Sequence, residues 1–316
     1  MTQIGTTSHH LIAVDIAKET FEVLSAEGSS LQVANDPAGL RRLLKWAGIA
    51  ARSDGRLRGH RGGYERPLLA MLHRAKIAVA LLNPQRLRAF AVSEGVKAKT
   101  DPIDARMILC FAQQKHPEPL PAPDPKAQEL AAWLDRRSHL TEAQAREKNR
   151  LQNSPKSIHR SIKFKRMICV LEKELAAIDQ KIDRLIAADA RLCSQFKALD
   201  AVKGVGKVTA WTLLAYLSEM PFLSRNKIVA LAGIAPYNRD SGKTSAKRSI
   251  WAGRAKVRKC LYMAAQTAAV HNPVIKPYVQ GLIGRGKPYK CAIVAAMRKL
   301  LLHLQSILKS QQKALA

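Results

Sequence analysis

The chain lacks the cysteine patterns of a zinc ribbon or of a disulfide framework. Its five cysteines are scattered, odd in number and without a C-x-x-C pair, so we expect ordinary intracellular core thiols. They are Cys110, Cys169, Cys193, Cys260 and Cys291. The chain also lacks an apolar run near the ~20 residues of a membrane span, and residues 1–10 lack the basic-then-apolar order of a signal peptide. These absences predict a cytoplasmic protein with no membrane contact.

Acidic residues are scarce as well. The chain has 24 Asp and Glu against 53 Lys and Arg, a net charge of +29, and residues 201–316 carry +18 of it because only Glu219 and Asp240 oppose 20 cations. Such a surface attracts polyanions, and nucleic acid is the expected partner because neutralised phosphates release their counterions. The basic partner surface is therefore predicted in the C-terminal third.

With 316 residues the chain can bury more than one core, so we expect two domains joined by a long helical element. Residues 1–115 alternate strand and helix patterns, which predicts a mixed α/β domain. The predicted strands cover 11–18, 20–25 and 77–82, and the predicted helices begin at Asp36 and cover 66–75. Prolines at every second position from 117 to 125 cannot lie in a regular helix. They predict an extended linker over 116–127.

Residues 128–195 are predicted to be helical. Apolar residues spaced three and four apart give a 3.5-residue repeat, at Ile168, Leu171, Leu175, Ile178, Ile182 and Leu185. This repeat indicates a coiled coil, within one chain as a helical hairpin or between chains as a dimer contact. The alternative is a helix packed on a globular core.

Residues 196–316 are predicted to form a mostly α-helical C-terminal domain. Within it, residues 202–207 (VKGVGK) resemble the loop of a helix-hairpin-helix motif, in which glycines let backbone amides approach a DNA phosphate. A plain connection between two helices is the alternative interpretation. The flanking Lys203 and Lys207 favour contact with DNA.

Three acids are candidates for phosphate chemistry. Asp101 and Asp104 are three positions apart at the start of a predicted helix, where Cβ atoms on one face lie about 5–6 Å apart. Asp15 lies inside an apolar strand, which is costly unless ionic partners hold the carboxylate. A divalent metal would satisfy these acids and support phosphoryl transfer. The alternative is that Asp101 is a helix N-cap and Asp104 a first-turn acid favoured by the helix dipole.

A serine in a basic loop is the second candidate. Ser241 stands beside a glycine in residues 237–244 (YNRDSGKT), where surrounding cations would stabilise an alkoxide and the charge developing on a phosphate. An ordinary turn is the alternative. The residues that we predict to bind nucleic acid are Lys203, Lys207, Arg239, Lys243, Lys247, Arg248, Arg254 and Arg258.

Together these motifs resemble the Piv-like insertion-sequence transposases, the IS-one-ten family. In the N-terminal part the resemblance is carried by residues 13–19 (AVDIAKE), 83–84 (NP), 90–95 (FAVSEG) and 99–106 (KTDPIDAR). In the C-terminal part it is carried by residues 231–236 (LAGIAP), 240–243 (DSGK), 247–250 (KRSI) and 257–263 (VRKCLYM). The motifs run over nearly the whole chain in the family's order.

The resemblance implies an RNase H-like domain of the Holliday-junction-resolvase (RuvC) type, with an acidic tetrad and Mg²⁺, joined by a coiled coil to a serine-bearing domain. Asp15, Asp101 and Asp104 match three of the acids, and Ser241 matches the nucleophile. It also implies DNA recombination through a covalent phosphoserine, a guide RNA, and a dimer or tetramer in which protomers share an active site.

One position departs from the family pattern. The family has a glutamate before a glycine and an aromatic residue at the second acid, whereas this chain has Gly59 there, in residues 59–64 (GHRGGY). The loss of one carboxylate from four predicts weaker divalent binding and reduced or absent activity. Glu65 is near in sequence but lies on the wrong side of Tyr64.

The segment around Gly59 is also unusually basic for a buried strand, since residues 56–61 read RLRGHR. Our hypothesis is a short frame slip in the gene that left a degenerate copy. Two other functions stay open: a non-catalytic nucleic-acid-binding remnant, and a metal-dependent junction nuclease in which Ser241 is structural.

Overall fold

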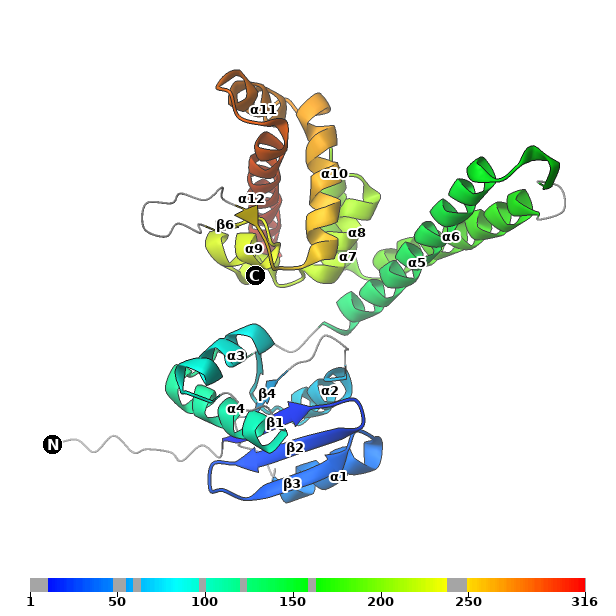
Figure 1. The fold of residues 1–316 in the computed structure, drawn as a ribbon. Helices are drawn as coiled ribbons and strands as arrows, with labels where there is room; N and C mark the ends of the chain where they lie inside the picture. Colours follow the sequence, from blue (N-terminus) through cyan, green and yellow to red (C-terminus); the bar gives the residue numbers. More distant parts are fainter. Residues whose placement is uncertain are drawn as a thin grey trace. The chain divides into compact units, whose positions relative to one another are not determined.

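The structure is a computed structural model that describes residues 11–47, 55–58, 64–96, 101–119, 124–158, 163–237 and 249–315. The chain divides into two compact units, residues 1–122 and 123–316. Each unit has its own core (Figure 1).

The first unit contains a five-stranded mixed sheet in the order β3-β2-β1-β4-β5. Its strands are β1 Ile12–Ile16, β2 Thr20–Ser25, β3 Ser30–Ala34, β4 Gly55–Arg58 and β5 Val79–Leu82. The first three strands pair antiparallel, and β4 and β5 run parallel to β1. The predicted N-terminal sheet is therefore confirmed. It contains two further strands, β3 and β4, that were not assigned from the sequence.

Four helices cover the sheet: α1 Pro37–Trp46, α2 Arg66–Arg74, α3 Pro84–Ser93 and α4 Asp101–Lys115. The helices α1 and α2 pack against one face of the sheet, and α3 and α4 pack against the other. Local sequence explains where they begin. Asp36 accepts a hydrogen bond of 2.6 Å from the Gly39 amide, Asn83 caps α3 in the same way, and a proline follows each cap.

The strand β4 lies in the basic segment whose composition is unusual for a buried strand. It pairs with β1 and β5, so the sheet is continuous in spite of the arginines at 56 and 58. Both neighbours of β4 in the sheet, β1 and β5, are mostly apolar strands. Backbone pairing with these two strands explains why the basic segment adopts a strand.

The second unit opens with a hairpin of two long helices, α5 Pro125–Asn153 and α6 Phe164–Ala187, with a short turn of 3₁₀ helix at Lys156–Ile158 (Figure 1). The two helices pack along each other within one chain. Of the predicted repeat, Ile178 and Ile182 are buried in the core, and Leu171, Leu175 and Leu185 pack partly buried against it. The repeat thus serves both the hairpin and the core of the unit.

The rest of the second unit is nearly all helical, as the sequence predicts. Its elements are α7 Ala190–Asp200, α8 Lys207–Tyr216, a 3₁₀ turn at Met220–Phe222, α9 Arg225–Leu231, α10 Ala255–His271, α11 Ile275–Gly284, α12 Tyr289–Leu315, and the short strands β6 Pro236–Tyr237 and β7 Ser249–Ile250. Trp211 and Met220 are fully buried, and Gln305 donates to the carbonyls of Met220 and Leu223 at 2.9 and 2.8 Å.

The helix α12 qualifies the expectation that no segment is long and apolar enough for a membrane. Among the described residues, 289–312 pass that test by length and composition. Half of this segment is buried, and Leu300, Leu301 and Leu304 are fully enclosed in the core. Its apolar character therefore has a packing explanation.

The five cysteines are all free, as predicted. Their description as core thiols is wrong, because Cys169 and Cys291 are exposed and the other three are only partly buried.

Candidate active site

Asp15 lies on β1, on the sheet face that α4 covers. Alternate residues of a strand point to opposite faces. On β1, Ile12, Val14 and Ile16 belong to the core beneath α1 and α2, whereas Ala13 belongs to the core beneath α3 and α4. Asp15 follows Ala13 by two positions and shares its face.

Asp104 lies in the first turn of α4 and is only 9% exposed. It precedes Ile108 by one helical turn, and Ile108 is fully buried in the same cluster as Ala13. The carboxylate of Asp104 and that of Asp15 therefore lie on the two surfaces that face each other, helix against sheet. A buried carboxylate is costly unless other groups satisfy it, so this position is unlike that of an exposed first-turn acid.

Asp101 is the first residue of α4, within the helix rather than before it. Its side chain lies outside the described residues. Among the side chains that are described, no group of three His, Cys, Asp or Glu is close enough to hold a metal ion. Asp15 and Asp104 carry carboxylate oxygens, which are the ligands that Mg²⁺ prefers, so the chemistry of this pair fits such an ion. The third predicted ligand, Asp101, is the first residue of α4.

The register of the sheet shows what surrounds Asp15. It stands opposite Glu22 of β2 and level with Arg58, the last residue of β4. Residues directly opposite in an antiparallel pair share a face, with Cβ atoms about 4.5–5.5 Å apart. Glu22, to which Gln32 donates a hydrogen bond, is therefore a second acid on this face. Sequence analysis missed it, although the alternation of 20–25 contained the signal.

Gly59 and the residues up to 63 lie outside the described residues, but β4 ends directly before Gly59. Because β1 and β4 are parallel neighbours, the two strands end on the same side of the sheet. Glu65, in contrast, precedes α2, whose Leu68 and Leu72 pack on the opposite face of the sheet.

Ser241 lies in residues 238–248, outside the described residues, together with Arg239, Lys243, Lys247 and Arg248. The two ends of that segment are described. They pair as β6 and β7, with Pro236 opposite Ile250 and Tyr237 opposite Ser249. The base of the serine segment is thus a two-stranded ribbon.

Two glycines pack this base tightly. Gly233 and Gly253 both have positive φ, +70° and +66°. A Cβ at Gly253 would come within 2.3 Å of the Gly233 amide nitrogen, and a Cβ at Gly233 would come within 2.3 Å of the Ala252 carbonyl oxygen. Only glycine satisfies both the conformation and the space at these positions.

Arg254 and Arg258 were predicted to bind nucleic acid, and the structure gives each of them protein partners. Arg258 donates to the carbonyls of Ala252 and Gly233, one from each side of the serine segment. Arg254 donates to the Tyr216 carbonyl and forms an ion pair of 2.5 Å with Glu219. Both guanidinium groups therefore fasten the base of the segment to α8 and α10.

The predicted helix-hairpin-helix loop connects α7 and α8. Gly204 has a φ of +97°, and a Cβ there would come within 2.6 Å of the Ala268 Cα, so close packing on α10 requires this glycine. The side chain of Asn272 donates to the Lys203 carbonyl at 2.9 Å. Both facts give the loop a structural role. The side chain of Lys203 is exposed and forms no ion pair with the described residues.

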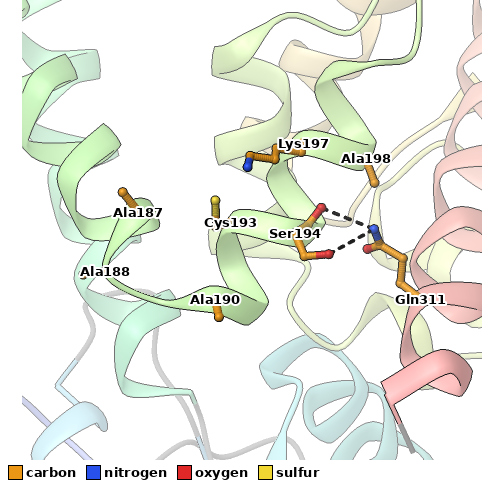
Figure 2. A pocket seen from close by; sticks show the side chains of 8 residues that line it. All are labelled: Ala187, Ala188, Ala190, Cys193, Ser194, Lys197, Ala198 and Gln311. Carbon is orange, nitrogen blue, oxygen red and sulfur yellow. Dashed lines mark hydrogen bonds between the residues drawn. The ribbon is translucent and has the colours of Figure 1, made fainter.

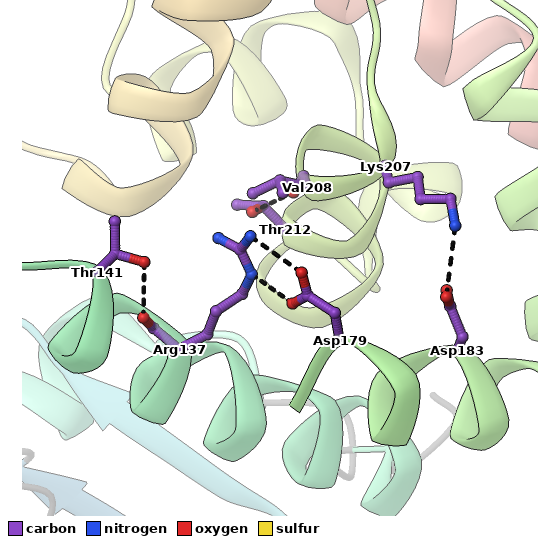
Figure 3. A network of polar contacts seen from close by, with 7 residues as sticks. All are labelled: Arg137, Thr141, Asp179, Asp183, Lys207, Val208 and Thr212. Atoms are coloured by element: carbon purple, nitrogen blue, oxygen red, sulfur yellow. Dashed lines mark hydrogen bonds and ion pairs between the residues drawn. The ribbon is translucent and has the colours of Figure 1, made fainter. Parts of the chain in front are cut away.

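Lys207 begins α8 and lies 3.3 Å from Asp183 of α6 (Figure 3). In the same view Arg137 of α5 donates twice to Asp179 of α6, at 2.6 and 3.2 Å. These polar contacts join the hairpin to itself and to α8. Lys207 is exposed, and such ion pairs contribute about 0–1 kcal/mol, so its charge stays accessible to a phosphate.

A shallow groove of about 850 Å³ lies between the end of α6, α7 and the end of α12 (Figure 2). Four of its eight lining residues are alanines, and Gln311 donates to the carbonyl and hydroxyl oxygens of Ser194 at 3.3 and 3.4 Å. It contains no acid and no predicted site residue, so it is separate from the candidate chemistry.

Comparison with known proteins matches both halves of the chain to one family. A family model described as Transposase matches residues 4–159, and the Transposase IS116/IS110/IS902 family matches residues 196–280. The chain is also similar to the pilin gene-inverting proteins of Moraxella lacunata and Moraxella bovis. Each is 28% identical over 307 residues, with 92% of both chains covered. The chain therefore belongs to the IS110 (IS-one-ten) family of transposases and is an enzyme of DNA recombination.

Proposed function

We propose that the chain cuts and rejoins DNA at a composite site that combines Asp15, Asp101 and Asp104 of the first unit with Ser241 of the second. The observation that carries the proposal is the placement of Asp104, a buried acid on the face of α4 that meets the Asp15 face of the sheet. Ligands of open α/β sheets bind outside the carboxyl ends of parallel strands, which is where β1 and β4 end side by side. We assign this unit to the RNase H-like (RuvC-type) class.

In the proposed reaction the Ser241 oxygen bonds to phosphorus while the bond from phosphorus to a deoxyribose oxygen breaks. The serine loses a proton and the leaving oxygen gains one, so a phosphodiester is exchanged for a phosphoserine diester. A second DNA hydroxyl then reverses the step on a new strand. One phosphate ester replaces another, so recombination needs no external energy source.

Mg²⁺ held by Asp15, Asp101 and Asp104 would supply positive charge next to the attacking and leaving oxygens. Lysines and arginines of the serine segment would neutralise the phosphate on the other side, with Lys243, Lys247 and Arg248 nearest to Ser241 in sequence. Residues 201–316 contain only two acids against 20 Lys and Arg, so few carboxylates compete with a phosphate for these cations, which supports that role.

We further propose that the active form is a dimer or tetramer, with the two parts of the site taken from different protomers, and that a structured guide RNA directs it to DNA in the cytoplasm. Family membership and the excess of basic residues support this part. The α5–α6 hairpin, whose apolar repeat we predict to form a coiled coil, would join the two catalytic parts.

A cleavage assay tests the proposal. The full chain, Asp104→Asn and Ser241→Ala are incubated with DNA and Mg²⁺, and products are separated under denaturing conditions, with Ser245→Ala of the same segment as the matched control. We expect a covalent protein–DNA adduct from the unaltered chain and the control, and none from the other two.

Other outcomes identify the alternatives. Cleavage that persists in Ser241→Ala, without adduct, would identify a metal-dependent nuclease. Binding of DNA that weakens steeply with salt, without cleavage by any variant, would identify a non-catalytic remnant.

A further inference from the structure

A second concentration of positive charge lies at the far end of the α5–α6 hairpin. Residues 146–166 contain eight Lys and Arg against one acid, Glu147, a net charge of +7 in 21 residues. We call this end the hairpin tip. The rest of the hairpin is balanced, with three cations and three acids over 125–145 and three cations and four acids over 167–187. Charge is therefore segregated along the hairpin.

The described cations of the tip are exposed, and most of them have no acidic partner among the described residues. The described ones are Arg146, Lys148, Arg150, Lys156, Lys163, Lys165 and Arg166, and each is exposed. Lys148 pairs with Glu172 at 3.4 Å, and Arg150 pairs with Glu147 at 2.6 Å. The other five have no carboxylate partner among the residues that the structure describes.

Folding of the hairpin does not explain these charges. The helix α6 has Lys165 and Arg166 in its first turn and no acid there, and Lys163 before it makes no side-chain cap. Cations at a helix N-terminus oppose the helix dipole and therefore destabilise the helix. Phe164, which is buried, supplies the packing at this end. The tip cations thus oppose the stability of the helix that carries them.

We propose that the hairpin tip binds the phosphate backbone of duplex DNA, as a contact independent of the basic surface of the C-terminal region. Charge complementarity favours duplex DNA as the partner, because a duplex carries a phosphate about every 1.7 Å along its axis. Clustered cations that bind these phosphates release counterions, which strengthens binding. The inference rests on the proposed recombination of DNA and adds a second place where DNA is held.

The length of α5 separates the hairpin tip from the base of the hairpin, where α5 contacts the C-terminal region. Asp135 of α5 binds Lys256 of α10 and the Tyr216 hydroxyl of α8, which fixes the base of the hairpin. From Asp135 to the end of α5 at Asn153, a helical rise of 1.5 Å per residue gives about 27 Å. This length corresponds to about eight base pairs, so the tip would contact DNA about eight base pairs away from the base of the hairpin.

The experiment measures the salt dependence of binding of the full chain to a 40-base-pair duplex of mixed sequence. The test variant is the triple substitution Lys156→Gln, Lys165→Gln and Arg166→Gln. The matched control is Arg136→Gln, Lys173→Gln and Arg184→Gln, which removes the same charge from exposed positions of the same hairpin outside the tip. None of the three forms an ion pair among the described residues. Thermal unfolding and gel filtration verify that both keep the fold and the oligomeric state.

We expect weaker binding by the tip variant and a plot of log K against log salt that is shallower by about 2 to 3. The control should keep the slope of the unaltered chain. Equal slopes for the tip variant and the unaltered chain, or equal changes in tip and control, would overturn the proposal. So would a loss confined to binding of RNA. Failure of the unaltered chain to bind duplex at all would instead remove the proposed function.

Discussion

At the scale of the residue, the proposed chemistry depends on two acids, of which Asp15 is partly buried and Asp104 is buried. Asp15 stands on an otherwise apolar strand, and Asp104 is enclosed on the sheet side of α4. An exposed acid near a helix N-terminus needs no explanation beyond the dipole, but a buried one requires partners. The enclosure of Asp104 thus distinguishes it from an exposed first-turn acid.

The substitution Gly59→Glu should raise activity. It returns a carboxylate to the end of β4, beside the end of β1, and a fourth carboxylate tightens divalent binding. We expect at least a tenfold gain in an excision or insertion assay, and a lower Mg²⁺ concentration at half-maximal rate. Gly59→Gln serves as the control without charge. Equal rates for the Glu and Gln variants would show that the missing carboxylate does not limit this chain.

Asp189 should make stability depend on pH. It caps α7 through the Leu192 amide at 2.9 Å and pairs with Lys126 at 2.6 Å. The Lys126 hydrogen bond, followed by the backbone amide, lowers the pKa of Asp189 below its usual range. A lowered pKa contributes stability that is complete above about pH 4 and disappears as the pH falls through the folded-state pKa.

We therefore expect Asp189→Ala to cost about 1 kcal/mol near pH 7 and less near pH 3. Asp189→Asn, which keeps a cap but not the ion pair, should cost less than Asp189→Ala at pH 7. Urea unfolding followed at both pH values measures this. A destabilisation that is the same at pH 7 and pH 3 would contradict the assignment.

At the scale of the element, the base of the serine segment is built to be rigid. The ribbon of β6 and β7, the contact of Gly233 with Gly253 and the two carbonyl bonds of Arg258 all fasten the same few residues. A nucleophile must be held within a fraction of an ångström of its productive position. This base supplies fixed ends for the segment that carries Ser241.

The substitution Gly253→Ala should disturb that base. The new Cβ would meet backbone atoms of Gly233 at 2.3 and 2.4 Å in a left-handed conformation, so we expect a loss of more than about 1 kcal/mol and slower cleavage. Gly281→Ala is the matched control, because Gly281 lies in α11 with open space around it and should gain about 0.5–1 kcal/mol. Thermal unfolding that ranks the two variants the other way would refute the packing argument.

How far the sequence predicts these elements varies with the kind of signal. The strands at 11–18, 20–25 and 77–82 and the helix after Asp36 are found where periodicity and capping predict them. The strand β4 could not be predicted, because its sequence is basic and its stability comes from pairing with β1 and β5. Tertiary pairing overrode local preference there.

Candidate site residues show the same limit. The spacing of Asp101 and Asp104 correctly places both in one helix, which follows from local geometry. The internal partners of Arg254 and Arg258 were beyond prediction, since each binds groups distant in sequence, such as the Tyr216 and Gly233 carbonyls. A basic residue in a basic region gives no local sign of whether it faces a phosphate or a carbonyl.

At the scale of the whole molecule, the chain consists of two units with separate cores, and the proposed chemistry is divided between them. The acids belong to residues 1–122 and the serine to residues 123–316. Net charge is divided as unevenly, since residues 146–166 and 201–316 together carry +25 of the +29. The second unit is therefore the part expected to hold DNA, while the first contributes carboxylates.

The most direct measurement of this division mixes two inactive chains in the Gly59→Glu background. Asp104→Asn lacks one acid but keeps the serine, and Ser241→Ala has the reverse defect. We predict that neither forms a covalent DNA adduct alone, and that the mixture forms one on the chain that keeps Ser241. Cleavage by either variant alone, or a mixture as inactive as its components, would contradict a site shared between protomers.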